Sequence, residues 1–111
     1  MSSNLRQGLY GLLAVLGLIT TWYYNLQFMA ETGGFSVAVF LSAWHANAAA
    51  SSILWDVSVA ALTFCVLAVA EARRIGMRHA WLYLVLTFTV ALGFAFPLFM
   101  MMRERHLAAP A

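Results

Sequence analysis

The stretch "AWHANAAASSILWD", residues 43–56, decides the fold, because it places a histidine, an asparagine and an aspartate inside an otherwise apolar run. As one helix, residues 35–70 would reach roughly 54 Å, which is too long for a single membrane span. The run must therefore break, and the small residues around Ser51 and Ser52 are the best internal breakpoint. The stretch predicts a junction between two helices.

The composition of the whole chain is that of an integral membrane protein. Its 111 residues are 64% hydrophobic and only 9% charged, with a mean hydropathy of +0.84. A soluble domain is nearer a quarter charged, because water must wet its surface. The six basic residues are all arginines at the edges of apolar runs, so the pI near 9.1 indicates membrane-flanking charge, and we expect no nucleic-acid partner.

Apolar runs predict an all-α membrane protein with three transmembrane helices in a single domain, residues 1–111. The expected spans cover about 8–30, 53–72 and 80–102. Between the first and second spans we expect a short interfacial or re-entrant helix over about 35–50, wedged against the other spans. A four-span alternative would let this segment cross the membrane as well.

Arginine placement favours three spans. In that topology Arg6 and the loop 71–79 lie on the same side and hold four of the six arginines. The positive-inside rule makes this side cytoplasmic. We therefore expect a bacterial inner-membrane (cytoplasmic or intracytoplasmic) protein, with its N-terminus in the cytoplasm and its C-terminus in the periplasm. Four spans would place the basic loop opposite Arg6.

Several motifs together resemble a known family. They are Asn47, "SSILWD" ending at Asp56, Glu71 before an arginine pair, and "PLFMMMRE" at 97–104. The pattern resembles DUF2834, a family of small bacterial membrane proteins without an established function. The resemblance covers nearly the whole chain, and "PLF" followed by "RE" is its most specific piece. The three methionines "MMM" at 100–102 stand where more variable residues, including an aromatic one, are expected in the family. The resemblance implies three spans and leaves the activity open.

A polar cluster at the outer membrane face is the main candidate site. A carboxylate such as Asp56 costs about 2.5–3.5 kcal/mol at the bilayer centre and less near the edge, where a helix N-terminus also favours it. The expected topology brings Arg103 to the same side, within reach of Asp56. The expected members are Asn25, His45, Asn47, Asp56 and Arg103. They form either a ligand or acid–base site, with Asp56 as the catalytic candidate, or a capping and salt-bridge network.

His45 is also a candidate pigment or metal ligand. A lone histidine in an apolar helix can bind the iron of haem or the magnesium of a chlorophyll, and the small residues after His45 leave room for a flat macrocycle. The chain supplies no second ligand and no CxxCH motif. A hydrogen-bonded or interfacial histidine is the simpler interpretation, so we expect a tetrapyrrole or carotenoid contact only through a host complex.

Two further patterns predict contacts with helices and lipids. Small residues at spacings of three and four predict a helix-packing face, formed by Ser58, Ala61, Cys65, Ala68 and Ala72. Arginines after the second span predict contacts with anionic lipid headgroups, and these are Arg73, Arg74 and Arg78. The alternative to a simple basic loop is that Glu71 pairs with Arg6 or Arg74 and fixes the first two spans.

The motifs of soluble enzymes do not occur in this chain: it has no P-loop, HExxH, GxSxG or paired cysteines. We expect a small accessory or structural subunit that packs against a larger bacterial membrane complex, respiratory or photosynthetic. One alternative is a membrane-embedded enzyme that acts on an isoprenoid-like substrate through Asp56. Its pocket would be walled by aromatic residues, namely Trp22, Tyr23, Tyr24, Trp44 and Trp55. Another is a homo-oligomeric pore or carrier.

Overall fold

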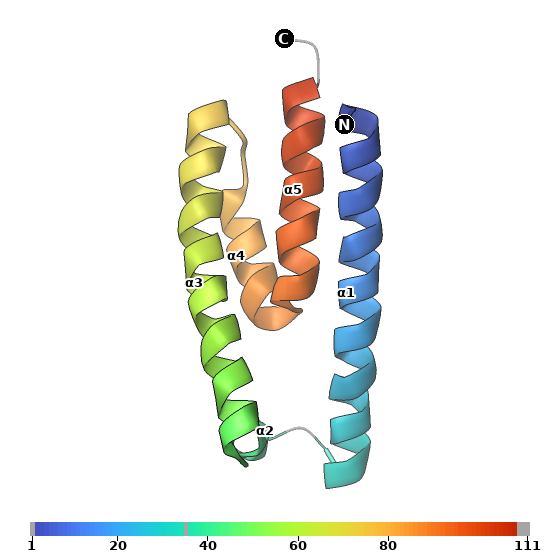
Figure 1. The fold of residues 1–111 in the computed structure, drawn as a ribbon, viewed down its shortest axis with the longest axis vertical. Helices are drawn as coiled ribbons and strands as arrows, with labels where there is room; N and C mark the ends of the chain where they lie inside the picture. Colours follow the sequence, from blue (N-terminus) through green and yellow to red (C-terminus); the bar gives the residue numbers. More distant parts are fainter. Residues whose placement is uncertain (1, 35, 109–111) are drawn as a thin grey trace.

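The computed structural model describes residues 2–34 and 36–108, and these residues fold into an elongated helical bundle of 51 × 23 × 23 Å (Figure 1). The helices are α1 (Ser3–Thr32), α2 (Val37–Trp44), α3 (Ala48–Ile75), α4 (Ala80–Thr89) and α5 (Leu92–Ala108). Among the described residues, two helices, α1 and α3, are long and apolar enough to cross a membrane. The prediction of an all-helical chain is confirmed.

The two long helices run in opposite directions, and both end at a glycine. Gly33 and Gly76 adopt the left-handed conformation with φ of 78° and 77°, and their N–H groups bond carbonyls of the preceding helical turn. Only glycine adopts this conformation without a steric cost, so both helices end at these points. α1 begins where the Ser2 hydroxyl accepts a hydrogen bond from the Leu5 N–H at 3.2 Å.

The junction inside residues 43–56 lies a few residues before the predicted breakpoint. Asn47 caps α3, because its Oδ1 accepts a hydrogen bond from the Ala50 N–H at 2.8 Å. Ser51 and Ser52 lie within the first turns of α3, since small residues are compatible with a helix once a cap has started it. The expected segment 35–50 is represented by α2, and residue 35 lies outside the described residues.

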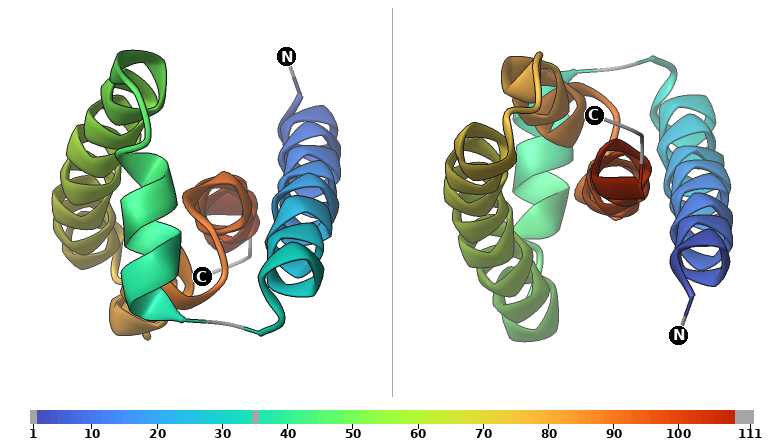
Figure 2. Two further views of the ribbon diagram at one scale, coloured as in Figure 1. Left: turned by 90° about the horizontal axis from the view of Figure 1, so that it is seen from below. Right: turned by 90° about the horizontal axis from the view of Figure 1, so that it is seen from above.

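Helix α2 lies across the end of the bundle. Figure 2 shows it roughly perpendicular to the long axis, at the end where α1 stops and α3 starts. Its N-cap is Ser36, whose hydroxyl accepts a hydrogen bond from the Val39 N–H at 3.4 Å. The arginine-bearing ends of α3 and α5 lie at the opposite end of the bundle (Figure 1).

The predicted third span, residues 80–102, is not confirmed. The segment forms a hairpin, in which α4 ends at Thr89 and α5 returns from Leu92. The N–H groups of Val90 and Ala91 both bond the carbonyl of Leu86, at 2.9 and 3.1 Å, and reverse the chain. The ten residues of α4 rise about 15 Å, which is half the thickness of a hydrocarbon core. Figure 1 shows the hairpin stopping about halfway down the bundle.

The hydrophobic core lies where the hairpin packs against α3. Phe64 and Phe99 are fully buried, and their rings lie 5.7 Å apart. Phe96 stacks on Phe64 at 4.7 Å, and Tyr83 of α4 contacts Phe99 edge-on at 5.2 Å. These four aromatic side chains connect α3, α4 and α5.

The first turn of α5 meets α1 through two glycines. A Cβ atom on Gly17 would lie 2.1 Å from the carbonyl oxygen of Gly93, so only glycine fits there. Pro97, four residues after Gly93, has no N–H, so the Gly93 carbonyl lacks its usual helical partner and remains free to face α1. The absent side chain and the absent donor together allow this close approach.

Candidate functional site

The predicted pair between Asp56 and Arg103 is not formed. Arg103 lies at the arginine-bearing end of the bundle, where its Nε donates to Glu71 Oε1 at 2.8 Å. Glu71 follows Asp56 by 15 residues on the same helix, a separation of about 22 Å. Because residues 80–102 form a hairpin rather than a span, Arg103 returns to the end of the bundle from which α4 starts. Asp56 is exposed on α3.

The other members of the predicted polar cluster have separate local environments. His45 is exposed and follows α2, with its Nδ1 2.9 Å from the carbonyl oxygen of Leu41. Asn47 caps α3. Asn25 is half-buried on α1 and lines a large apolar cavity. Within the described residues, no three histidine, cysteine, aspartate or glutamate side chains gather in the manner of a metal site.

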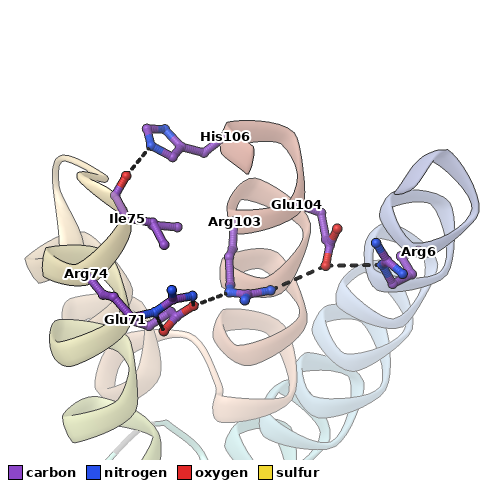
Figure 3. A network of polar contacts seen from close by, with 7 residues as sticks. All are labelled: Arg6, Glu71, Arg74, Ile75, Arg103, Glu104 and His106. Atoms are coloured by element: carbon purple, nitrogen blue, oxygen red, sulfur yellow. Dashed lines mark hydrogen bonds and ion pairs between the residues drawn. The ribbon is translucent and has the colours of Figure 1, made fainter. Parts of the chain in front are cut away.

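A chain of alternating charges ties the helices together at the arginine-bearing end (Figure 3). Arg6 Nε of α1 lies 3.2 Å from Glu104 Oε1, and Arg103 Nη1 lies 3.4 Å from the same oxygen. Arg103 also contacts Glu71, which Arg74 binds with two hydrogen bonds of 2.6 and 2.9 Å. We call these five residues the charge network. It connects α1, α5 and α3, which are far apart in the sequence.

Burial makes Glu104 the central residue of the charge network. Glu104 is only 7% exposed, and it lies between two arginines. A buried carboxylate requires such partners, because its desolvation is otherwise costly. The predicted pairing of Glu71 with Arg74 is formed, whereas Arg6 pairs with Glu104 instead of Glu71.

Every arginine in the chain belongs to this end of the bundle. Arg6 is in the first turns of α1, and two arginines end α3. The full set is Arg6, Arg73, Arg74, Arg78, Arg103 and Arg105. His106 adds a further connection, since its Nε2 lies 2.8 Å from the carbonyl oxygen of Ile75 (Figure 3). Of the arginines predicted to meet lipid headgroups, Arg73 and Arg78 are exposed, and Arg74 is held by Glu71.

The stripe of small residues on α3 faces the hairpin. Its buried members are Ala61, Ala68 and Ala72, and the half-buried ones are Ser58 and Cys65. Phe64, which lies on the same face, is more deeply buried than Cys65. Small side chains leave room for its ring between the helices, so the packing face combines alanines with one large aromatic residue.

A large apolar cavity extends from the middle of the bundle to α2. Its volume is about 1800 Å³, it is partly open to its surroundings, and described residues of all five helices line it, from Tyr10 of α1 to Met100 of α5. At the hairpin, the indole Nε1 of Trp22 donates to the carbonyl of Val90 at 3.0 Å. At α2, the Phe40 ring lies 5.1 Å from Phe28 and 4.8 Å from Trp44. The cavity exists because the hairpin stops halfway.

The cavity includes only part of the aromatic pocket that the sequence predicts. Trp22 and Trp44 line it. Tyr23, Tyr24 and Trp55 are 63–67% exposed and lie outside it. Asp56, the predicted catalytic carboxylate, is also not part of its lining.

The fold and these sites define a small all-helical protein with two helices long and apolar enough to cross a membrane, a charge network at one end and a large apolar cavity. The family model for proteins of unknown function DUF2834 matches residues 9–105. The chain therefore belongs to the DUF2834 family, as the sequence motifs predict. No curated protein and no solved structure matches it significantly.

Proposed function

We propose that the protein is a small accessory subunit that packs inside the membrane against a larger bacterial membrane complex. The observation that carries the proposal is the exposed carboxylate of Asp56 on α3. Within the described residues, Asp56 forms no hydrogen bond and no ion pair. Carboxylates at membrane depth rarely face lipid, and they pair with protein groups or with water.

The depth of Asp56 supports this proposal. Asp56 precedes Arg73 by 17 residues, about 26 Å along the helix. With Arg73 at one boundary of a hydrocarbon core about 30 Å thick, Asp56 lies just inside the other boundary. Its exposed neighbours Ile53, Trp55 and Val59 are apolar. A partner that donates a hydrogen bond to Asp56 and covers these side chains fits this face.

We also propose that the arginine-bearing end faces the cytoplasm in a bacterial inner membrane. The asymmetry is complete, since all six arginines belong to this end, and positive charge favours the cytoplasmic side. The predicted periplasmic C-terminus does not fit, because Glu104 near the end of α5 contacts Arg6 near the start of α1. A periplasm-dependent reporter enzyme fused to the C-terminus is expected to stay inactive. An active fusion contradicts this orientation.

Purification from native membranes tests the accessory role. The tagged protein is expected to elute in mild detergent with another membrane protein at a fixed ratio. Asp56→Asn is expected to weaken retention of the partner about tenfold, because hydrogen bonds to charged groups contribute about 1.5–3 kcal/mol. Glu31→Gln is the matched control. Glu31 is also an exposed carboxylate on the half of the bundle away from the arginines, and it accepts a hydrogen bond from Gln27 at 3.3 Å.

The outcomes separate the functions that the sequence left open. A solitary chain from native membranes overturns the accessory role, and so does full retention of the partner by Asp56→Asn. Self-association at a defined stoichiometry favours a homo-oligomeric pore or carrier instead. Absorption in the visible range by the complex indicates a pigment in the host assembly. The enzyme alternative loses support because Asp56 lies outside the cavity.

A further inference from the structure

The apolar cavity has an uncharged lining. Among the described residues that surround its volume of about 1800 Å³, there is no aspartate, glutamate, arginine or histidine. An ion placed there loses its hydration without gaining a counter-ion, which is costly in a low-dielectric space. The cavity therefore selects neutral molecules. Its volume also exceeds the roughly 300–1,000 Å³ of ordinary small-molecule pockets, which suits a molecule with a long apolar chain.

Apart from Tyr10, the polar side chains of the lining on α1 gather near the hairpin. Gly17 and Trp22 contact the hairpin directly, at Gly93 and Val90. Thr21 is therefore level with the hairpin, and Asn25 lies one turn further along α1. Both side chains line the cavity, and neither makes a hydrogen bond within the part of the chain that the structure describes.

Ser58 on α3 reaches the same level from the opposite side. The ring of Phe64 stacks on that of Phe96 at 4.7 Å, which fixes the register of α3 against α5. Ser58 precedes Phe64 by six residues and Leu92 precedes Phe96 by four, or about 9 and 6 Å along parallel helices. Ser58 thus lies within about 3 Å of the level at which α5 begins. Its hydroxyl makes no hydrogen bond within the described residues.

The start of α5 adds hydrogen-bond donors to this level. Leu92 and Gly93 line the cavity, and their N–H groups donate to no carbonyl among the described residues. First-turn N–H groups have no partner within their own helix, and the helix dipole gives them a partial positive charge. The Asn25 amide and the hydroxyls of Thr21 and Ser58 can donate as well. The hairpin level of the cavity therefore offers donors from α1, α3 and α5, beside the last carbonyl groups of α4, which have no donor within that helix.

The far end of the cavity is apolar. It is lined near α2 by Met29, Phe40, Trp44 and Leu54. Beside the hairpin, the rings of Phe88 and Phe96 offer flat apolar surfaces. We infer that the cavity binds a neutral lipophilic molecule whose carbonyl group sits at the hairpin and whose apolar chain extends towards α2. A prenylated quinone has this chemistry, with carbonyl acceptors on a planar ring and a long hydrocarbon tail.

Tryptophan fluorescence provides the test. Trp55 and Trp81 are exposed on the outer surface, so a Trp55→Phe/Trp81→Phe background leaves Trp22 and Trp44, both in the cavity. The probe is a benzoquinone with a short prenyl tail, added to protein in neutral detergent, and it is expected to quench this emission saturably. Squalene is a hydrocarbon without a carbonyl, and oleate is an anion. Each is expected to displace the quinone and restore the emission only at a concentration at least tenfold higher than that of the quinone.

Adjacent threonines give a matched pair of variants. Thr21→Val and Asn25→Leu each remove a donor at the hairpin, and each is expected to weaken quinone binding about three- to tenfold. Thr20→Val removes the same hydroxyl from an exposed position, where it donates to the Leu16 carbonyl at 2.7 Å. It is expected to leave quinone binding unchanged. Circular dichroism verifies that each variant stays folded.

Each contrary result overturns a defined part of the inference. Unsaturable quenching excludes a quinone-type ligand in the cavity. Equal competition by squalene shows that the cavity selects apolar volume alone, without recognition of the carbonyl. Tighter binding of oleate contradicts the selection of neutral molecules. If Thr20→Val and Thr21→Val weaken quinone binding equally, the Thr21 hydroxyl at the hairpin does not recognise the carbonyl. None of these results depends on whether a protein partner is retained.

Discussion

The two halves of the bundle differ in how fully they are packed. At the arginine-bearing half, α1, α3, α4 and α5 all lie side by side, Phe64 and Phe99 are fully buried, and the charge network joins three helices. At the other half only α1 and α3 continue, and α2 lies across the end. The cavity of about 1800 Å³ is lined in this half by Met29, Trp44 and Leu54, and it continues beside the hairpin as far as Tyr10 and Met100.

The depth of the hairpin accounts for this difference, because it determines how many helices lie at each level of the bundle. Four helices at one level fill the interior with side chains, which gives a packed core. Two helices at the next level cannot do so, and the side chains of Thr21, Asn25 and Ser58 make no hydrogen bond within the described residues. Substitutions in the packed half are thus expected to lower the free energy of unfolding, and substitutions of polar side chains in the cavity lining are expected to weaken ligand binding.

The largest effect is expected at the border between the halves. Gly17→Ala places a Cβ atom 2.1 Å from the Gly93 carbonyl oxygen, so the backbones of α1 and α5 must move apart. The expected loss in the free energy of unfolding is about 3 kcal/mol, at the upper end of the usual cost of overpacking. Unfolding in a denaturing detergent, followed by circular dichroism, measures it.

Gly8→Ala is the control for this variant. Gly8 is on the same helix, and a Cβ atom there meets nothing within 4 Å. Alanine is favoured over glycine in a helix by about 0.5–1 kcal/mol, so Gly8→Ala is expected to be neutral or slightly stabilising. Equal stability of the two variants contradicts the close contact between Gly17 and Gly93.

A smaller effect is expected within the charge network. Glu104→Gln leaves Arg6 and Arg103 without their shared carboxylate, and Glu104 is only 7% exposed. The Arg6 side chain is 38% exposed, so solvent screening reduces the loss. We expect the free energy of unfolding to fall by about 1–2 kcal/mol, measured as for Gly17→Ala.

A double-mutant cycle with Arg6→Gln sharpens this test, and Arg105→Gln, at an exposed neighbouring position, is the control. The effects of Arg6→Gln and Glu104→Gln are expected to be non-additive, because the two residues are in contact. Strict additivity contradicts the ion pair. Quenching by the quinone probe is expected to stay unchanged in Glu104→Gln, since the charge network lies outside the cavity.

The sequence predicts the two long helices well and the hairpin poorly, for a physical reason. Long apolar runs and glycine caps are local features, and they place α1 and α3. A run of 23 apolar residues at 80–102 is equally compatible with a crossing helix and with a hairpin. The reversal at Val90 and Ala91 contains neither glycine nor proline. The positions of the arginines do favour the hairpin, because a hairpin places all six arginines at one end of the bundle.

The candidate sites could be predicted only residue by residue. Asn25 and Glu71 stand out in the sequence as polar groups at the ends of apolar runs. Their surroundings depend on tertiary structure, since the cavity beside Asn25 exists only because the hairpin is short. Arg6 and Glu104 pair across nearly the whole chain length, and no local spacing reveals such a contact. Because residues 80–102 form a hairpin and not the expected third span, Arg103 contacts Glu71 rather than Asp56.

The smallest effect on stability is expected at Asp56, on the outer surface of the open half. Asp56 is exposed and has no partner within the described residues, so Asp56→Asn should change the free energy of unfolding of the isolated chain by less than about 0.5 kcal/mol. Detergent unfolding of the purified chain, compared with Glu104→Gln, measures this. The same variant is expected to retain its membrane partner about tenfold more weakly. A carboxylate that is dispensable for folding yet required for association belongs to an interface. A destabilisation as large as that of Glu104→Gln would instead assign Asp56 to a contact within the chain and remove the main support for the accessory role.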